Sequence, residues 1–229
     1  MIISHKHKFI FIKTRKTAGT SVEIALSSIC GEEDIIARIA APDELARKKL
    51  GFLGAQNYHI PFGKYSRRDW AKAVLHRQKR LEYYRHISCA ELVEYIEPEI
   101  WNTYYKFTID RNPFDKAVSM FYFRKADEKY ESITEFIADG GLGEMRSFDL
   151  YTIRGVLAVD KIYKYEEMDY FLKDISTKLN LDTPLKLPQY KAKSKFRKKA
   201  NYKDVLDAEA IELIKTIYAR EIQLLDYEY

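Results

Sequence analysis

The sequence has 229 residues, with 39 basic and 34 acidic side chains and a formal net charge of +5. Because 46% of the residues are hydrophobic and 14% are aromatic, a chain of this length can bury a full core without disulfides or metal. Intrinsic disorder and a disulfide-stapled mini-protein are therefore excluded.

The sequence shows no sign of a membrane-spanning or secreted protein. No apolar run approaches the roughly 20 residues of a membrane span, and no signal peptide pattern begins the chain. The two cysteines, Cys30 and Cys89, lack CxxC spacing and a neighbouring histidine cluster, so they indicate neither a disulfide framework nor a metal site. We expect a soluble cytoplasmic protein with a single domain over residues 1–229, because no linker divides the chain.

The chain opens with a strand, a loop and a helix. Residues 9–13 are a short apolar run of β-forming residues, typical of a buried strand. After a polar loop, residues 20–30 have the apolar spacing of a helix that Gly31 ends.

Helix signals follow over the next 70 residues. Pro42 and the two acids after it predict a helix start, and Gly51 predicts its end. Residues 51–65 predict a loop. The segments 66–69 and 88–91 each have the Ser-x-x-acid pattern of a capping box.

The second half of the chain repeats the opening pattern. Residues 105–110 predict a strand, and Asn112 with Pro113 predicts the start of the next helix. We also predict three more helices and one strand. The helices begin at Ser132, cover residues 170–179 and run from Asp207 to Leu225, and the strand covers residues 161–165. Strands that alternate with helices indicate an α/β protein with a parallel sheet.

The first loop has the chemistry of a phosphate site. It ends in Gly19, Thr20 and Ser21 at a predicted helix amino terminus, where backbone N–H groups and the helix dipole attract anions, and Lys16 adds charge. It is not a Walker loop, because the glycine follows the lysine instead of opening the loop. An ordinary turn capped by Thr20 is the structural alternative.

Two motifs resemble those of the sulfotransferases that use 3′-phosphoadenosine 5′-phosphosulfate (PAPS), especially the branch related to carbohydrate 2-O-sulfotransferases. The run Lys16-Thr17-Ala18-Gly19-Thr20-Ser21 resembles the family's 5′-phosphosulfate loop. Arg111 and Ser119, eight residues apart after the second strand, are similar to its 3′-phosphate motif. The resemblance implies a P-loop-like three-layer fold with a central, mainly parallel sheet flanked by helices.

The resemblance also implies a reaction. A bacterial-type enzyme of this kind transfers a sulfuryl group from PAPS to an acceptor hydroxyl, with a saccharide as the first expectation, and leaves 3′-phosphoadenosine 5′-phosphate (PAP). His86 lies in a segment that looks like the family's His-x-x-Ala region, which makes it the first candidate for the catalytic base, and His59 is the second. Lys16 would stabilise charge on the transferred group. The scheme requires no metal.

Two departures from the family pattern bear on donor binding. Arg15 stands where the family usually has proline, and Asp110 precedes Arg111, where its carboxylate could pair with the arginine and compete for it. The basic segment Lys191–Lys203 could cover the nucleotide, contact an anionic acceptor or be a solvated loop.

Two other functions remain open from the sequence. A nucleotide-dependent kinase-like P-loop enzyme would require ATP and magnesium, and the missing Walker pattern counts against it. A non-enzymatic module that binds anions or nucleic acid could use the basic segment, but no nucleic-acid-binding motif is present. We therefore expect no nucleic-acid partner. The sequence does not indicate the oligomeric state.

Overall fold

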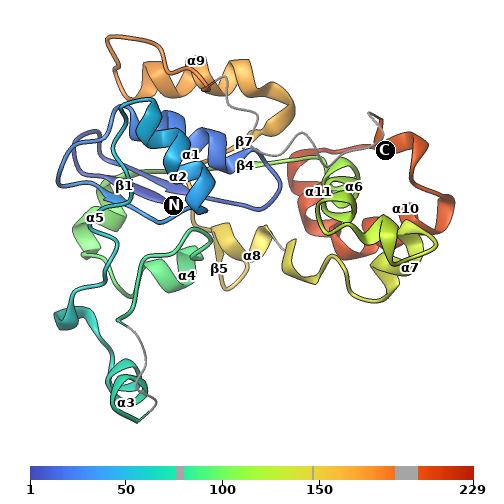
Figure 1. The fold of residues 1–229 in the computed structure, drawn as a ribbon, viewed down its shortest axis with the longest axis horizontal. Coiled ribbons are helices and arrows are strands. Elements are labelled where there is room, and N and C mark those ends of the chain that lie inside the picture. Colours follow the sequence, from blue (N-terminus) through green and yellow to red (C-terminus); the bar gives the residue numbers. More distant parts are fainter. Residues whose placement is uncertain (76–79, 146, 189–200) are drawn as a thin grey trace.

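A five-stranded sheet forms the centre of the protein. The computed structural model describes residues 1–75, 80–145, 147–188 and 201–229, except for the side chains of residues 72 and 73 (Figure 1). The strands lie in the order β3-β1-β2-β4-β7. Their bounds are β1 Ile2–Ser4, β2 Phe9–Ile12, β3 Ile35–Ile36, β4 Tyr105–Asp110 and β7 Lys161–Lys164.

Four of the five strands run in the same direction. β2, β4 and β7 pair in parallel, whereas β1 is antiparallel to both β2 and β3. Ile12 pairs with Thr108, so β2 and β4 end side by side at one edge of the sheet. The predicted α/β fold with a mainly parallel sheet is confirmed, and the two strand-to-helix loops that carry the motifs start from neighbouring strands.

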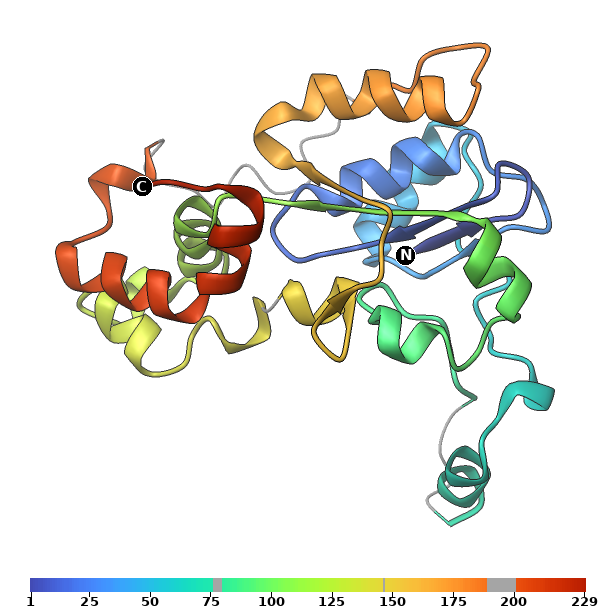
Figure 2. The same cartoon turned by 180° about the vertical axis from the view of Figure 1, so that it is seen from behind.

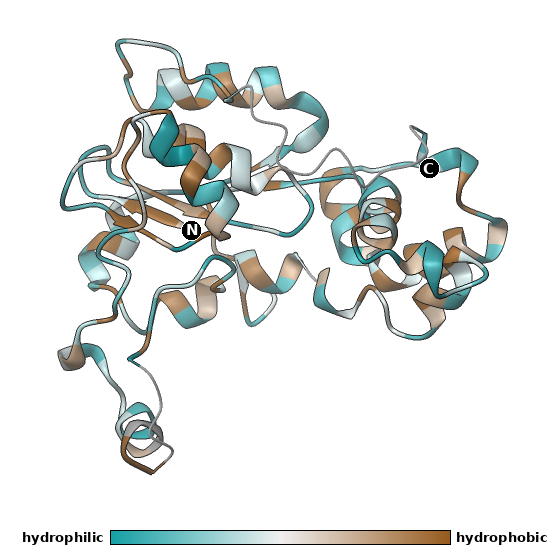
Figure 3. Cartoon of the chain, in the orientation of Figure 1, coloured by the Kyte–Doolittle hydropathy of each residue, from teal (hydrophilic) through white to brown (hydrophobic). Residues whose placement is uncertain are grey.

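Helices cover both faces of the sheet because its strands alternate their buried side chains between the two faces. Phe9, Phe11 and Phe107 pack against α1 (Gly19–Ser27) and α9 (Met168–Lys178). Ile10 and Ile12 pack on the other face, toward α4 (Cys89–Leu92) and α5 (Pro98–Thr103). The sheet strands carry the apolar residues drawn in brown in Figure 3.

Four further helices form a lobe beside the sheet. In Figures 1 and 2, α6 (Pro113–Phe123) leaves the end of β4 and packs with α7 (Ile133–Ala138), α10 (Ala208–Ile217) and α11 (Ala219–Leu225). The other elements are α2 Ala41–Lys49, α3 Arg67–Leu75, α8 Phe148–Tyr151, the hairpin β5 Thr152–Ile153 and β6 Val156–Leu157, and short 3-10 turns at Phe62–Lys64, Ala126–Glu128, Gly143–Met145, Tyr165–Glu167 and Tyr202–Asp204. None of the described helices is long and apolar enough to cross a membrane.

Most predicted helix starts are confirmed by the capping bonds. Ser66 and Asp69 exchange hydrogen bonds, with Ser66 N–H donating to the carboxylate at 2.8 Å and Asp69 N–H to the Ser66 hydroxyl at 3.2 Å. Asn112 caps α6 by accepting from Phe114 N–H at 3.0 Å, and Asp207 accepts from Ala210 N–H at 2.8 Å. The local hydrogen-bonding chemistry of these side chains is therefore enough to start the helices.

Two features differ from the sequence prediction. The helix predicted from Asp207 to Leu225 is interrupted at Tyr218, which leaves the helical region and separates α10 from α11. The short strands β1 and β3 were not predicted, because runs of three and two residues are too short to show a period. Residues 189–200, which include most of the basic segment, lie outside the described residues.

Candidate active site

The loop between β2 and α1 is shaped to present backbone N–H groups. Lys16 and Ala18 have the left-handed φ values of 62° and 56°. Ala18 is the amino-terminal cap of α1, and no side chain makes a capping bond there. Left-handed residues within such a turn direct successive N–H groups toward one point, and the helix dipole adds positive potential. The loop can therefore hold an anionic oxygen cluster such as a phosphate.

A buried lysine supports this loop from behind. The Lys13 ammonium group donates to the Thr20 hydroxyl at 3.1 Å and forms an ion pair with the buried Glu23 carboxylate. A Cβ atom at Gly19 would lie 2.8 Å from Lys13 Cγ, closer than such atoms approach. Only glycine fits at this position, because its missing side chain leaves room for Lys13 to pack against the start of α1.

Two threonine hydroxyls join the loop to the neighbouring strand. The Thr14 and Thr17 hydroxyls lie 2.9 Å apart, and Thr14 also donates to the carbonyl of Ile109 in β4. Both side chains are buried. The Thr17 hydroxyl therefore supports the loop from inside, whereas Ser21, on α1, is partly exposed.

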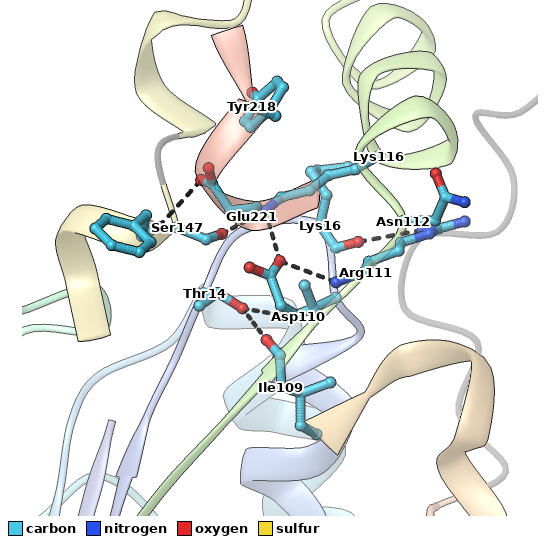
Figure 4. A network of polar contacts seen from close by, with 12 residues as sticks. Thr14, Lys16, Ile109, Asp110, Arg111, Asn112, Lys116, Ser147, Tyr218 and Glu221 are labelled. Atoms are coloured by element: carbon cyan, nitrogen blue, oxygen red, sulfur yellow. Dashed lines mark hydrogen bonds and ion pairs between the residues drawn. The ribbon is translucent and has the colours of Figure 1, made fainter. Parts of the chain in front are cut away.

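Arg111 connects the two sequence motifs. One of its terminal nitrogens donates to the carbonyl oxygen of Lys16 at 3.1 Å, across 95 residues of sequence (Figure 4). Its Nε donates to Asp115 Oδ2 at 2.7 Å, and the guanidinium lies 4.3 Å from the ring centroid of Tyr165. The structure thus brings the predicted 3′-phosphate arginine directly against the predicted 5′-phosphate loop.

Asp110 does not pair with the guanidinium of Arg111, so that prediction is wrong. Its carboxylate accepts from the Lys116 ammonium at 2.7 Å, from the Tyr151 hydroxyl at 3.1 Å and from the backbone N–H of Arg111 at 2.9 Å. Successive side chains of a strand point to opposite sides, which directs Asp110 away from the Arg111 side chain. The arginine's partner is Asp115, one helical turn later in α6.

The Asp110–Lys116 ion pair is buried and reaches into the helical lobe. Both side chains are 1% exposed. Lys116 also donates to the Ser147 hydroxyl, and nearby Glu221 accepts from the backbone N–H of Phe148 at 3.2 Å. Burial raises the pKa of the Glu221 carboxyl. Sequence reasoning missed these supporting residues, because they are spread over three segments and only the fold brings them together.

His86 lies against the same loop. Its Nδ1 is 2.9 Å from the carbonyl oxygen of Lys13. A carbonyl oxygen only accepts, so Nδ1 carries the proton and Nε2 keeps its lone pair. Burial lowers the pKa of the imidazole from 6.5 to about 3, and the charges of Lys13 and Arg15 add to this. The His86 imidazole is therefore neutral at pH 7.

His59, the second candidate base, is placed differently. Its Nδ1 lies 3.7 Å from a carboxylate oxygen of Glu82, and its ring packs against Tyr58 with centroids 4.7 Å apart. These contacts hold His59 in the segment before α3. The contact with the loop between β2 and α1 is made by His86, through the Lys13 carbonyl.

Lys16 contacts α6, and Ser119 is part of it. The Lys16 ammonium lies 3.9 Å from the ring centroid of Phe123, and Ser119 is one helical turn before Phe123. Residues four apart lie on the same face of a helix. Ser119, which is partly exposed, therefore lies on the same face of α6 as Phe123. Arg15 lies farther out, with its guanidinium 3.7 Å from Glu144.

Comparisons with known proteins identify the family of the chain and match its fold. A model of the sulfotransferase family matches residues 1–228. The chain belongs to the sulfotransferase family. The crystal structure of mouse sulfotransferase SULT7A1 complexed with PAP has the same fold, with a TM-score of 0.50 and 15% identity over 99% of this chain and 91% of that chain. No curated protein matches the sequence.

Family membership settles the class of reaction. The protein is a PAPS-dependent sulfotransferase, which decides against the kinase and the non-enzymatic binding module. In this sulfotransferase Arg111 contacts the loop 16–21 through the Lys16 carbonyl, and His86 contacts the Lys13 carbonyl three residues before that loop.

The low pKa of His86 predicts how the stability of this sulfotransferase depends on pH. In the unfolded chain the imidazole has a pKa near 6.5, so between about pH 6.5 and pH 3 the unfolded state binds a proton that the folded state does not. The free energy of unfolding should therefore fall as the pH decreases through this range. Urea unfolding at pH 7.5, 6 and 5 should show a smaller fall for His86→Gln, and equal slopes for both proteins would contradict the prediction.

Proposed function

We propose that this sulfotransferase transfers the sulfuryl group of PAPS to an acceptor hydroxyl with His86 as the general base. The observation that carries the proposal is the hydrogen bond between Arg111 and the carbonyl of Lys16, 3.1 Å long. It joins a loop suited to one phosphate with an arginine suited to a second. PAPS carries phosphate at both its 5′ and 3′ positions.

The donor is held at its two phosphates. The 5′-phosphosulfate lies against the backbone N–H groups of residues 17–21, with the Thr20 and Ser21 hydroxyls and the Lys16 ammonium beside it. The left-handed residues and the uncapped start of α1 support this placement. The 3′-phosphate is bound by Arg111 and Ser119, and the planar guanidinium matches the phosphate oxygens.

The transfer needs a base on the acceptor side and positive charge on the donor side. The acceptor oxygen forms a bond to sulfur as the bond from sulfur to the 5′-phosphate oxygen breaks, and PAP leaves. His86 Nε2 takes the hydroxyl proton, and its neutral state at pH 7 supports this role. Lys16 stabilises the charge that develops on the leaving phosphate. The negative donor raises the affinity of His86 for the proton by opposing the charges of Lys13 and Arg15.

We also propose that the acceptor is a saccharide and that the enzyme is of the bacterial, cytoplasmic type. The resemblance of the loop 16–21 and of the His86 segment to the carbohydrate 2-O-sulfotransferase branch supports the acceptor class. All bonds in the scheme are made and broken without a metal ion.

Calorimetric titration with PAP tests the donor site. We expect tight binding of PAP and at least hundredfold weaker binding of adenosine 5′-phosphate, which lacks the group that Arg111 holds. ATP with magnesium serves as the third ligand. Equal affinity for PAP and adenosine 5′-phosphate, or a preference for ATP with magnesium, would refute the proposed donor site.

A further inference from the structure

One part of the chain projects away from both the sheet and the helical lobe. Residues 62–75, here called the arm, contain the 3-10 turn Phe62–Lys64 and α3. Figures 1 and 2 show the arm from two sides, and in both views α3 lies clear of every other helix. The arm supplies none of the groups proposed to bind the donor.

Large apolar side chains of the arm are exposed. Phe62 is 53% exposed, Trp70 46%, Val74 74% and Leu75 75%. The rings of Phe62 and Trp70 stack with centroids 5.8 Å apart, and Tyr65 lies 5.3 Å from each. Val74 follows Trp70 by one helical turn, so these side chains form a continuous surface. A continuous apolar surface on a projecting element indicates an interaction site.

The same arm is basic. Residues 62–75 contain four basic residues and one acidic residue, and the exposed Arg67 and Arg68 lie in the first turn of α3. The acidic residue, Asp69, is buried and bonded to Ser66. Arg80, just beyond, places its guanidinium 4.9 Å from the ring centroid of Phe62. The arm therefore presents cations next to exposed aromatic and aliphatic groups.

We propose that the arm docks the enzyme on an anionic lipid bilayer. A short helix with exposed tryptophan and aliphatic side chains beside arginines has the composition of an interfacial helix, which buries its apolar groups at the boundary between headgroups and acyl chains. The arginines contact the anionic headgroups. Because the arm projects, its apolar tip enters the interface while the donor site stays in water.

Two other occupants fit the arm less well. A second copy of the chain docking arm against arm would bring the arginines of both arms together and place like charges in contact. A sulfated polysaccharide would satisfy the arginines but would leave the aliphatic Val74 and Leu75 exposed. The bilayer matches both the charge and the apolar surface.

Tryptophan fluorescence gives a direct test, because the chain has only two tryptophans. In the full-length Trp101→Phe protein, Trp70 is the sole reporter. Vesicles of phosphatidylcholine with about one-third phosphatidylserine supply the anionic surface, and pure phosphatidylcholine vesicles are the comparison. We expect a blue shift of Trp70 emission and co-sedimentation with the anionic vesicles, both weakened by high salt.

Two paired variants separate the charge from the apolar contact. Arg67→Glu with Arg68→Glu, and Val74→Ser with Leu75→Ser, should each weaken vesicle binding at least tenfold. The matched controls are Lys48→Glu with Lys49→Glu at the end of the nine-residue α2, and Val156→Ser with Leu157→Ser, a pair 70% and 45% exposed in the β5–β6 hairpin. Both controls should bind as the parent does. Circular dichroism and PAP affinity should be unchanged in all four.

Three results would overturn the proposal. The first is an unshifted Trp70 emission with anionic vesicles. The second is tighter binding to a sulfated polysaccharide that only the arginine variant weakens, which would assign the arm to a polyanion. The third is self-association lost in Val74→Ser with Leu75→Ser, which would assign it to a second copy.

Discussion

Replacement of His86 by alanine is expected to lower kcat by between about a hundredfold and ten-thousandfold, the range that a positioned general base contributes. The variant removes the Nε2 lone pair, whose availability follows from the Nδ1 hydrogen bond to the Lys13 carbonyl at 2.9 Å. The measurement is the rate of sulfuryl transfer from labelled PAPS to a panel of saccharide and phenol acceptors at pH 7.

The matched control is His59→Ala, because His59 contacts Glu82 and Tyr58, whereas His86 contacts the Lys13 carbonyl. It should keep near-normal turnover. PAP affinity should be similar in both variants, since neither imidazole is proposed to hold a phosphate. The opposite pattern, with normal turnover in His86→Ala and none in His59→Ala, would move the base to His59.

Replacement of Arg111 by alanine should weaken PAP binding about a hundredfold, or ~2.7 kcal/mol, because it removes charge-assisted hydrogen bonds to the 3′-phosphate. Adenosine 5′-phosphate should bind the variant and the parent equally. Calorimetric titration of both ligands measures the difference. Unchanged PAP affinity in Arg111→Ala would show that the 3′-phosphate lies elsewhere.

The second ligand also controls for damage to the loop. Arg111 donates to the Lys16 carbonyl, so a collapsed loop would weaken adenosine 5′-phosphate as much as PAP. Arg111→Lys should recover only part of the affinity, because an ammonium keeps the charge but lacks the planar fork. Arg124→Ala, at the exposed end of α6 beside Glu144, should bind PAP as the parent does.

Local chemistry accounts for what the sequence predicted well. β4 covers the predicted residues 105–110, and Asn112 caps α6, because a β-rich run and an Asn-Pro pair depend on near neighbours. The break at Tyr218 was not predicted because the apolar spacing continues through it. That break is a property of the packed lobe, in which Tyr218 is 1% exposed.

The candidate site also contains some residues that the sequence could predict and others that it could not. The loop 16–21 and Arg111 follow strands and have recognisable spacing, so the sequence could single them out as candidates. The choice between Asp110 and Asp115 as the partner of Arg111 depended on the direction of each side chain. Asp110 is next to Arg111 in the sequence, but its side chain points toward Lys116. Asp115 lies in the first turn of α6, where its carboxylate reaches the Arg111 guanidinium. Distant supports such as Ser147 had no sequence signal.

The hydrogen bond from Arg111 to the Lys16 carbonyl has a consequence for ligand selection. It joins the two elements that are proposed to bind the phosphates, and it forms within the chain itself, independently of a nucleotide. The Asp110–Lys116 pair beneath it resists adjustment, because separating two buried charges is costly. With the donor held as proposed above, the spacing between the loop 16–21 and Arg111 selects for the spacing of the two phosphates of the ligand. We therefore expect a nucleotide with its second phosphate on the 2′-oxygen to bind more weakly than PAP.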